Sequence, residues 1–216
     1  MAADIADEGA RLRSAIEQRL RGSAPGGDPF LPHMTERPPE DLAALRELLP
    51  TELARAAVLV PVVEREQGLT VLLTRRASHL KNHAGQVSFP GGRIEAGDPG
   101  PWEAALREAR EEIGLGPEFV RLAGYLRDHF VITGYVVTPV VAFVRPGFNL
   151  QLDRTEVEEA FEVPLSFVLD RANHVPRERN FAGRTFKGYD IPYQGHNIWG
   201  ATAVMLMSLC RLLEQS

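Results

Sequence analysis

Residues 91–115 constrain the fold most, because they predict a glycine turn, a loop and an amphipathic helix in direct succession. Pro101 stands where such a helix begins and Gly114 where it ends. The preceding turn, residues 89–92, ends in two glycines and lets backbone approach a ligand closely. The helix has an apolar face at helical spacing, made of Trp102, Leu106, Ala109 and Ile113.

A second face of the same helix is acidic. Glu108, Glu111 and Glu112 fall within an arc of roughly 100°, where like charges destabilise a helix by a few tenths of a kcal/mol. One interpretation is a solvated face balanced by Arg107 and Arg110. The organised turn, loop and helix favour the other, a divalent cation bound mainly by Glu108 and Glu112. Oxygen ligands without a neighbouring cysteine suit Mg²⁺ or Mn²⁺.

The segment resembles the signature of the Nudix hydrolases, a family that cleaves nucleoside diphosphates linked to another group. Two positions depart from that signature. Asp98 stands where a Glu is expected, and eight residues instead of seven separate it from Arg107, the extra one lying in the loop before the helix. The matching residues are Gly92, Arg107, Glu108, Ala109, Glu111, Glu112, Gly114 and Leu115.

A narrower resemblance concerns residues 72–92, which are similar to the stretch that precedes the signature in the coenzyme A pyrophosphatase branch. That branch tends to carry the Asp and the longer loop, and it often has Arg where this chain has Lys81. Residues 196–203 are similar to its C-terminal helix entry. The resemblance covers about residues 55–213. It implies hydrolysis of coenzyme A or acyl-coenzyme A to 3′,5′-ADP and (acyl-)4′-phosphopantetheine.

The resemblance also implies roles for individual residues. Arg107, between Glu103 and Glu111, is expected to orient the glutamates. The general base is left open between Glu111, Glu112 and Glu156, with Glu111 favoured. The predicted metal ligands are Glu108, Glu111, Glu112 and the carbonyl group of Gly92.

A basic cluster lies close to the same segment. Its guanidinium and ammonium groups suit a diphosphate or a 3′-phosphate. Phe89 is a candidate for stacking on adenine, although packing in the core is the favoured interpretation. The predicted substrate-binding residues are Arg75, Arg76, Lys81, Arg93 and Phe89.

The chain as a whole predicts an α/β protein with a mixed sheet between helices, and the resemblance specifies the Nudix α/β/α sandwich. Residues 1–50 are expected to be an N-terminal helical extension and linker, and residues 51–216 the Nudix domain. Whether residues 1–50 cap the fold, form a dimer contact or move freely is left open. The expected elements are helices over 1–22, 41–49 and 198–213, a linker over 23–40, a hairpin of 56–63 with 69–74, strands over 86–89, 119–127 and 135–144, a helical or turn segment over 156–161 that 165–169 extends, and a hairpin within 177–193.

Composition excludes several classes of function. A net charge of −5 argues against nucleic-acid binding. No apolar run approaches the ~18 residues of a membrane span, and the acidic N-terminus does not resemble a secretory signal. The single cysteine, Cys210, precludes an intrachain disulfide. We therefore expect a cytoplasmic enzyme with a small, coenzyme A-like nucleotide substrate and no membrane partner, while a homodimer is left open.

Two alternatives remain at the level of sequence. One is a Nudix hydrolase for ADP-ribose, NADH or a dinucleoside polyphosphate. The other is a ligand-sensing Nudix module without turnover. The second is disfavoured because such modules usually lose helix glutamates, whereas this chain keeps Glu108, Glu111 and Glu112.

Overall fold

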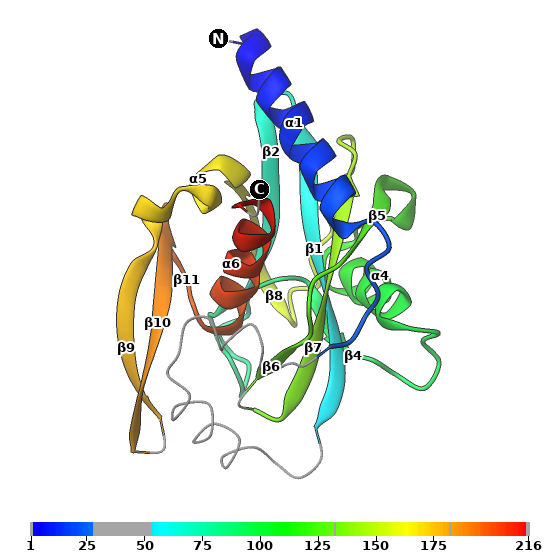
Figure 1. Ribbon diagram of the computed structural model, residues 1–216. Helices are drawn as coiled ribbons and strands as arrows, with labels where there is room; N and C mark the ends of the chain where they lie inside the picture. The colour runs from blue at the N-terminus through cyan, green and yellow to red at the C-terminus, as the bar shows by residue number, and fades with distance from the viewer. Residues whose placement is uncertain (1, 28–52, 132, 182, 215–216) are drawn as a thin grey trace.

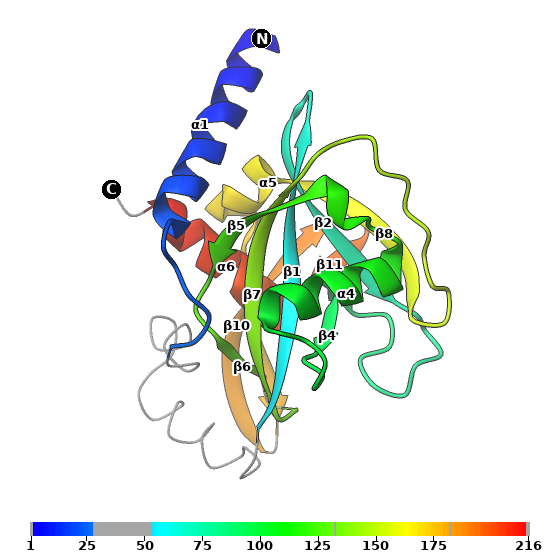
Figure 2. The ribbon, with the colours of Figure 1, turned by 90° about the vertical axis from the view of Figure 1, so that its right-hand side faces the viewer.

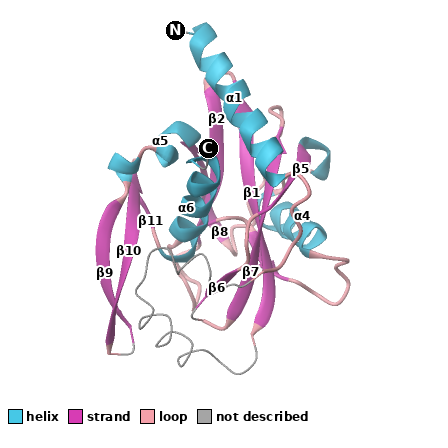
Figure 3. Ribbon diagram, in the orientation of Figure 1, coloured by secondary structure: helices cyan, strands magenta, loops and turns pink. Residues whose placement is uncertain are grey.

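A computed structural model describes residues 2–27, 53–131, 133–181 and 183–214 of the chain. A large sheet has helices on both sides, and a small second sheet stands beside it (Figures 1 and 3). The helices are α1 (Ala2–Leu20), α4 (Pro101–Ile113), α5 (Leu165–Leu169) and α6 (Gly200–Glu214), with 3₁₀ turns at Pro117–Phe119 and Arg171–Asn173. The strands are β1 (Ala54–Arg65), β2 (Gly68–Arg76), β3 (Val87–Ser88), β4 (Gly91–Arg93), β5 (Val120–Tyr125), β6 (His129–Val131), β7 (Tyr135–Val144), β8 (Val157–Pro164), β9 (Val175–Phe181), β10 (Arg184–Tyr193) and β11 (His196–Ile198).

The large sheet is mixed, as expected. Its main order is β3-β2-β1-β7-β5, while β4, β6 and β8 pair with β1, β7 and β2. β1 and β7 run parallel from Ala54–Tyr135 to Val63–Val144, and the other pairings in this sheet are antiparallel. Both central strands are mostly apolar because both faces of this part of the sheet are covered.

Alternate residues of the central strands enter two separate cores. Ala56, Val60 and Val62 of β1 face a core shared with α1, α5 and α6. Ala57 and Leu59 face a second core shared with α4. Seen from the side, α4 crosses one face of the sheet while α1 and α6 lie on the other (Figure 2). The prediction of an α/β/α sandwich is confirmed.

The small sheet is antiparallel in the order β11-β10-β9. Its hairpin confirms the prediction for residues 177–193. The strand β11 leads directly into α6, where Thr202 Oγ1 donates a hydrogen bond of 2.9 Å to the carbonyl group of Val87. This contact joins the small sheet and α6 to the segment that precedes the glycine turn.

One element differs from the prediction. Residues 156–161 were expected to be a helix or turn, but Val157–Pro164 form strand β8, which pairs antiparallel with β2. A register shift opposite Arg75 and Arg76 interrupts the alternation of apolar and polar residues. Because of this bulge, Val157 lies in the core shared with α4, whereas Phe161 packs against the core shared with α6. The helix after Pro164 is confirmed as α5.

The N-terminal helix α1 packs against the body of the protein. Ile16 is 0% exposed and Leu20 2% exposed in the core beneath α6. The predicted helix over 41–49, and the predicted linker from residue 28 onward, lie outside the described residues. No helix in the described part of the chain is long and apolar enough to cross a membrane.

Candidate active site

The glycine turn is packed too closely to accept side chains. A Cβ atom on Gly91 would lie 2.4 Å from the carbonyl oxygen of Ala57, and one on Gly92 would lie 2.5 Å from Oε1 of Glu108. Real Cβ atoms essentially never come so close to another heavy atom. Gly91 therefore lets β4 lie closely against β1, and Gly92 brings the backbone of β4 directly against Glu108 of α4.

Helix α4 has the boundaries that its sequence predicts. Pro101 occupies its first turn, and Gly114 ends it in the left-handed conformation with φ 68°. Because the apolar face of the helix is buried, its acidic face lies beside β4, and the three glutamates are buried to different extents. The side chains of Glu112, Glu108 and Glu111 are 5%, 16% and 59% exposed.

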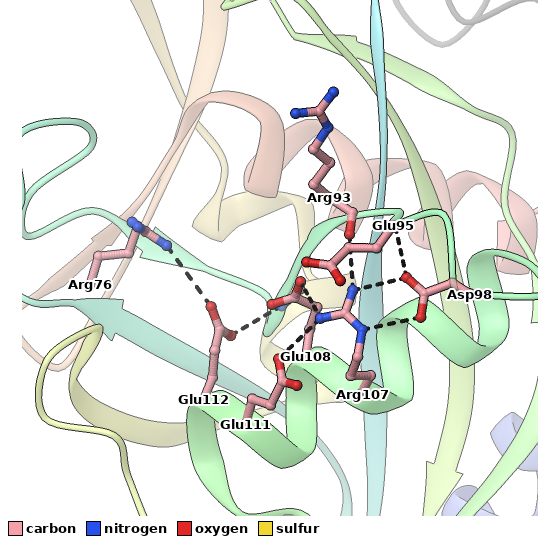
Figure 4. A network of polar contacts seen from close by, with 9 residues as sticks. Arg76, Arg93, Glu95, Asp98, Arg107, Glu108, Glu111 and Glu112 are labelled. Carbon is pink, nitrogen blue, oxygen red and sulfur yellow. Dashed lines mark hydrogen bonds and ion pairs between the residues drawn. The ribbon is translucent and has the colours of Figure 1, made fainter.

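Arg107 is the centre of a network of polar contacts (Figure 4). Its Nε and Nη2 atoms donate to the two carboxylate oxygens of Asp98 at 3.1 and 2.9 Å. Nη1 donates to Glu108 at 2.9 Å and to Glu111 at 3.0 Å. Nη2 also donates to the carbonyl group of Arg93 at 3.0 Å. Of the two glutamates that flank Arg107 on the helix, Glu111 contacts it, and its other carboxylate partners are Asp98 and Glu108.

Asp98 is the residue whose role the sequence did not reveal. As a departure from the signature it looked like a weak position, yet it binds Arg107 through both carboxylate oxygens. This hydrogen bonding from Arg107, helped by the backbone N–H of Glu95, lowers the pKa of Asp98. The only signal in the sequence is that Asp98 occupies an acidic position of the signature.

Glu112 is the most buried of the helix glutamates. Its Oε2 atom accepts a 3.1 Å hydrogen bond from the backbone N–H of Gly91, and its Oε1 atom lies 4.0 Å from Nη1 of Arg76. Burial is the main reason that the pKa of Glu112 rises to about 8, and the charges of Glu108 and Glu156 add to it. Burial also raises the pKa of Glu108.

Glu156 lies in the turn just before β8, as predicted. Its backbone N–H donates to the carbonyl group of Asp153 at 3.0 Å, and its carbonyl group accepts from Ala77 at 2.8 Å. The same turn is joined to α4, because the N–H of Asp153 donates to the carbonyl group of Glu112 at 2.9 Å. The charge of Glu156 therefore acts on the helix glutamates from a second element.

The predicted substrate-binding residues are not equivalent. Arg76 reaches Glu112, whereas Arg75 pairs with Glu158 and Glu159 at 3.2 Å each. Lys81 and Arg93 are exposed, in the loop after β2 and at the end of β4. Phe89 is 2% exposed inside the core that lies beneath α6. This burial assigns Phe89 to packing and corrects its prediction as an adenine-stacking residue.

The donor atoms around β4 suit a hard divalent cation. They are carboxylate oxygens without a neighbouring cysteine. The pKa values of Glu108 and Glu112 are raised mainly by burial and further by neighbouring carboxylates, and a bound cation would favour their ionised form. In this arrangement Arg107 holds Glu108 and Glu111, while Glu112 faces Gly91. Over the described residues, no three His, Cys, Asp or Glu side chains are already grouped so that they could hold a metal ion.

Known proteins similar to this chain point to one family. The model of the NUDIX domain family matches residues 53–183. The Nudix hydrolase NudL of Enterobacter sp. (strain 638), described as uncharacterized, is 42% identical over 156 residues, which are 72% of this chain and 80% of that protein. Its counterpart in Salmonella paratyphi B is 41% identical over the same shares.

Among solved structures, the Caenorhabditis elegans Ap4A hydrolase binary complex is 22% identical with a TM-score of 0.45, over 51% of this chain and 80% of that one. The NUDIX domain of Shewanella oneidensis NrtR, complexed with ADP ribose, is 20% identical with a TM-score of 0.42, over 63% and 84%. The family model and the NudL relatives decide the assignment. The chain belongs to the Nudix hydrolase family, whose members act on phosphoric anhydrides.

Proposed function

We propose that this Nudix hydrolase cleaves the diphosphate bond of coenzyme A or acyl-coenzyme A, giving 3′,5′-ADP and (acyl-)4′-phosphopantetheine. The coarser activity follows from the family, which hydrolyses nucleoside diphosphate-linked substrates and generally uses divalent metal ions. The coenzyme A substrate is the proposal. It is supported by the similarity of residues 72–92 to the coenzyme A branch and by the positions that these residues take.

The observation that carries the proposal is the position of Arg76. It ends β2 within residues 72–92, and its Nη1 atom lies 4.0 Å from the buried carboxylate of Glu112. Its side chain is 27% exposed. A partly exposed guanidinium group beside the helix glutamates is suited to bind a phosphate oxygen of the substrate.

Glu108, Glu111, Glu112 and the carbonyl group of Gly92 are the residues that would hold the ion, Mg²⁺ or Mn²⁺. When bound, a divalent ion supplies positive charge at the diphosphate and activates water. The oxygen-only donor set favours these two ions over Zn²⁺.

The protein's own residues would do the rest by positioning. Arg107 fixes Glu108 and Glu111 through its hydrogen bonds. Arg76 would orient the diphosphate. The proton of the attacking water would pass to a carboxylate, for which we propose Glu111 or Glu156. The exposed Lys81 and Arg93 are proposed contacts for the 3′-phosphate.

We also propose a cytoplasmic location. A homodimer is a further possibility, which a measurement of the molecular mass in solution would test. The supporting observation for the location is Cys210, a free and buried thiol. Burial raises the pKa of this thiol to about 11, so the cysteine is protonated and unreactive.

A substrate panel tests the proposal. Coenzyme A, 3′-dephospho-coenzyme A, acetyl-coenzyme A, ADP-ribose, NADH and a dinucleoside polyphosphate are each incubated with Mg²⁺, Mn²⁺ or EDTA, and the products are identified by chromatography. We expect 3′,5′-ADP from coenzyme A only when an ion is present. Preferred cleavage of ADP-ribose or NADH would overturn the proposed substrate, and equal rates for the 3′-dephospho form would remove the role of the 3′-phosphate.

Matched variants locate the site. Glu112→Gln should lower the rate by about 100-fold or more, because the substitution removes a charge on which the transition state depends. Glu103→Gln changes an exposed glutamate of the same helix outside the network and should leave the rate unchanged. Full activity of Glu112→Gln would contradict the proposed site. Nucleotide binding by the wild-type protein without hydrolysis would support a sensing module instead.

A further inference from the structure

Strand β8 carries a bulge near its start, across from Arg75 and Arg76 of β2. Arg75 is opposite Glu159 and Arg76 is opposite Val157, so Glu158 is the extra residue of β8. In a regular strand adjacent side chains point to opposite faces. Here the Nη2 atom of Arg75 lies 3.2 Å from Oε1 of Glu158 and 3.2 Å from Oε2 of Glu159. The bulge allows one guanidinium group to hold two adjacent carboxylates.

The bulge is also held from its other side. His196 of β11 stacks on Phe161 of β8, with ring centroids 3.8 Å apart and planes 9° from parallel. Its Nε2 atom lies 3.5 Å from Oε1 of Glu159. Glu159 therefore joins Arg75 of β2 to β11, and the start of β8 is fixed against two strands.

Glu156 lies two residues before the extra residue. The structure gives no ion pair to Glu156 within its described ranges, whereas Glu158, Glu159 and Glu162 of β8 all have basic partners. Without Arg75, the carboxylates of Glu158 and Glu159 would repel one another. Because Glu158 is the extra residue, Val157 enters the core shared with α4, and Glu156 lies in the turn directly before Val157.

We infer that Arg75 is a positioning residue, which fixes Glu156 by holding Glu158 and Glu159 together across the β8 bulge, and that it is not a ligand of the substrate. This inference rests on the proposed function of the α4 glutamates and changes the role predicted for Arg75. The side chains of Arg75, Glu158 and Glu159 are 37%, 40% and 39% exposed. Ion pairs this exposed contribute little to the free energy of unfolding, so we assign them a role in the local conformation of β8.

Kinetics of single and double variants test the inference. Arg75→Met should lower kcat by about 5- to 20-fold and leave KM within about twofold, because substrate contacts are intact. In a Glu156→Gln background the same change should alter kcat by less than about twofold, since residues that act through one another are not additive. Arg75→Lys should restore part of the rate. A raised KM with unchanged kcat, or effects that multiply in the double variant, would overturn the inference.

A binding measurement separates this inference from the substrate proposal. Titration calorimetry with Mn²⁺ alone should give weaker binding for both Glu156→Gln and Arg75→Met. Loss of a positive charge by itself would make binding of a cation tighter, so tighter binding by Arg75→Met contradicts a positioning role. If wild-type protein binds Mn²⁺ but cleaves no compound of the panel, the substrate proposal fails and the Mn²⁺ comparison still decides the role of Arg75.

The matched control is Arg65→Met. Arg65 donates hydrogen bonds of 2.5 and 3.0 Å to Glu162, at the other end of β8. The substitution therefore removes an Arg–Glu pair from the same strand, away from the bulge. It should leave kcat and Mn²⁺ affinity unchanged. Equal losses from Arg65→Met and Arg75→Met would assign both to general stability of β8 and overturn the inference.

Discussion

The backbone N–H of Gly91 donates a 3.1 Å hydrogen bond to Oε2 of Glu112 and fixes the glycine turn to helix α4. This bond satisfies one carboxylate oxygen of a side chain that is only 5% exposed. It opposes the effect of burial on the pKa of Glu112 but does not cancel it. The helix therefore presents a carboxylate that is held in place and poorly solvated.

The first prediction follows from the pKa of Glu112. The folded protein keeps a proton on Glu112 up to about pH 8, whereas the ordinary pKa is 4.5. Since the folded state binds more protons between these values, the free energy of unfolding should fall as pH rises, by on the order of a few kcal/mol at most. Urea unfolding in EDTA at pH 5 and pH 8 measures the fall.

Two comparisons complete that experiment. Glu112→Gln should remove most of the pH dependence, while Glu103→Gln should keep it. Saturating Mg²⁺ should reduce the fall in wild-type protein, because a cation favours the ionised carboxylate. An unfolding free energy with the same pH dependence in wild-type and Glu112→Gln proteins would contradict the role assigned to burial.

The second prediction concerns the space at Gly92. In Gly92→Ala the new methyl group would lie 2.5 Å from Oε1 of Glu108, so Glu108 must move away from β4. We expect the hydrolysis rate to fall by about 10-fold or more, since small displacements of catalytic groups are costly. Gly97→Ala is the control, because nothing lies within 4 Å of a Cβ atom there. Equal rates for the two variants would show that Glu108 can shift without consequence.

The third prediction tests the geometry of Arg107. In Arg107→Lys the positive charge stays, but one ammonium group cannot contact Asp98, Glu108 and the Arg93 carbonyl group together. Unfolding free energy should fall by about 1–2 kcal/mol, and the rate should fall as Glu108 loses its orientation. Urea unfolding and steady-state kinetics measure the two effects. Arg110→Lys, at an exposed position of the same helix, should match wild-type protein.

The sequence predicted those parts of the site that lie on one element. The boundaries of α4 follow from Pro101 and Gly114, and its acidic face follows from helical spacing alone. The mixed sheet and its central strand β7 follow from the apolar runs. Local patterns are sufficient here because each feature depends on residues a few positions apart.

Contacts between elements could not be predicted in the same way. The sequence places Arg75 and Arg76 side by side, but adjacent side chains of β2 point to opposite faces, so Arg75 meets Glu158 and Glu159 whereas Arg76 meets Glu112. The bulge also interrupts the strand-like alternation at the start of β8, so a helix or turn was predicted there. Asp98 likewise acquires its role only when the loop folds back onto Arg107. These features arise from pairing between distant segments.

The fourth prediction concerns the N-terminal helix. Ile16 is 0% exposed and contributes to the core beneath α6, and Glu17 forms an ion pair with Arg121 of β5. If α1 is integral to the fold, Ile16→Ala should lower the unfolding free energy by about 2–4 kcal/mol, as for other buried aliphatic side chains. Arg11→Ala, at an exposed position of the same helix, should change it by less than about 0.5 kcal/mol. A single cooperative unfolding transition with this loss places α1 within the folded unit. An unchanged free energy for Ile16→Ala would instead make residues 1–50 a separable extension, because a helix that unfolds independently does not contribute to the main transition.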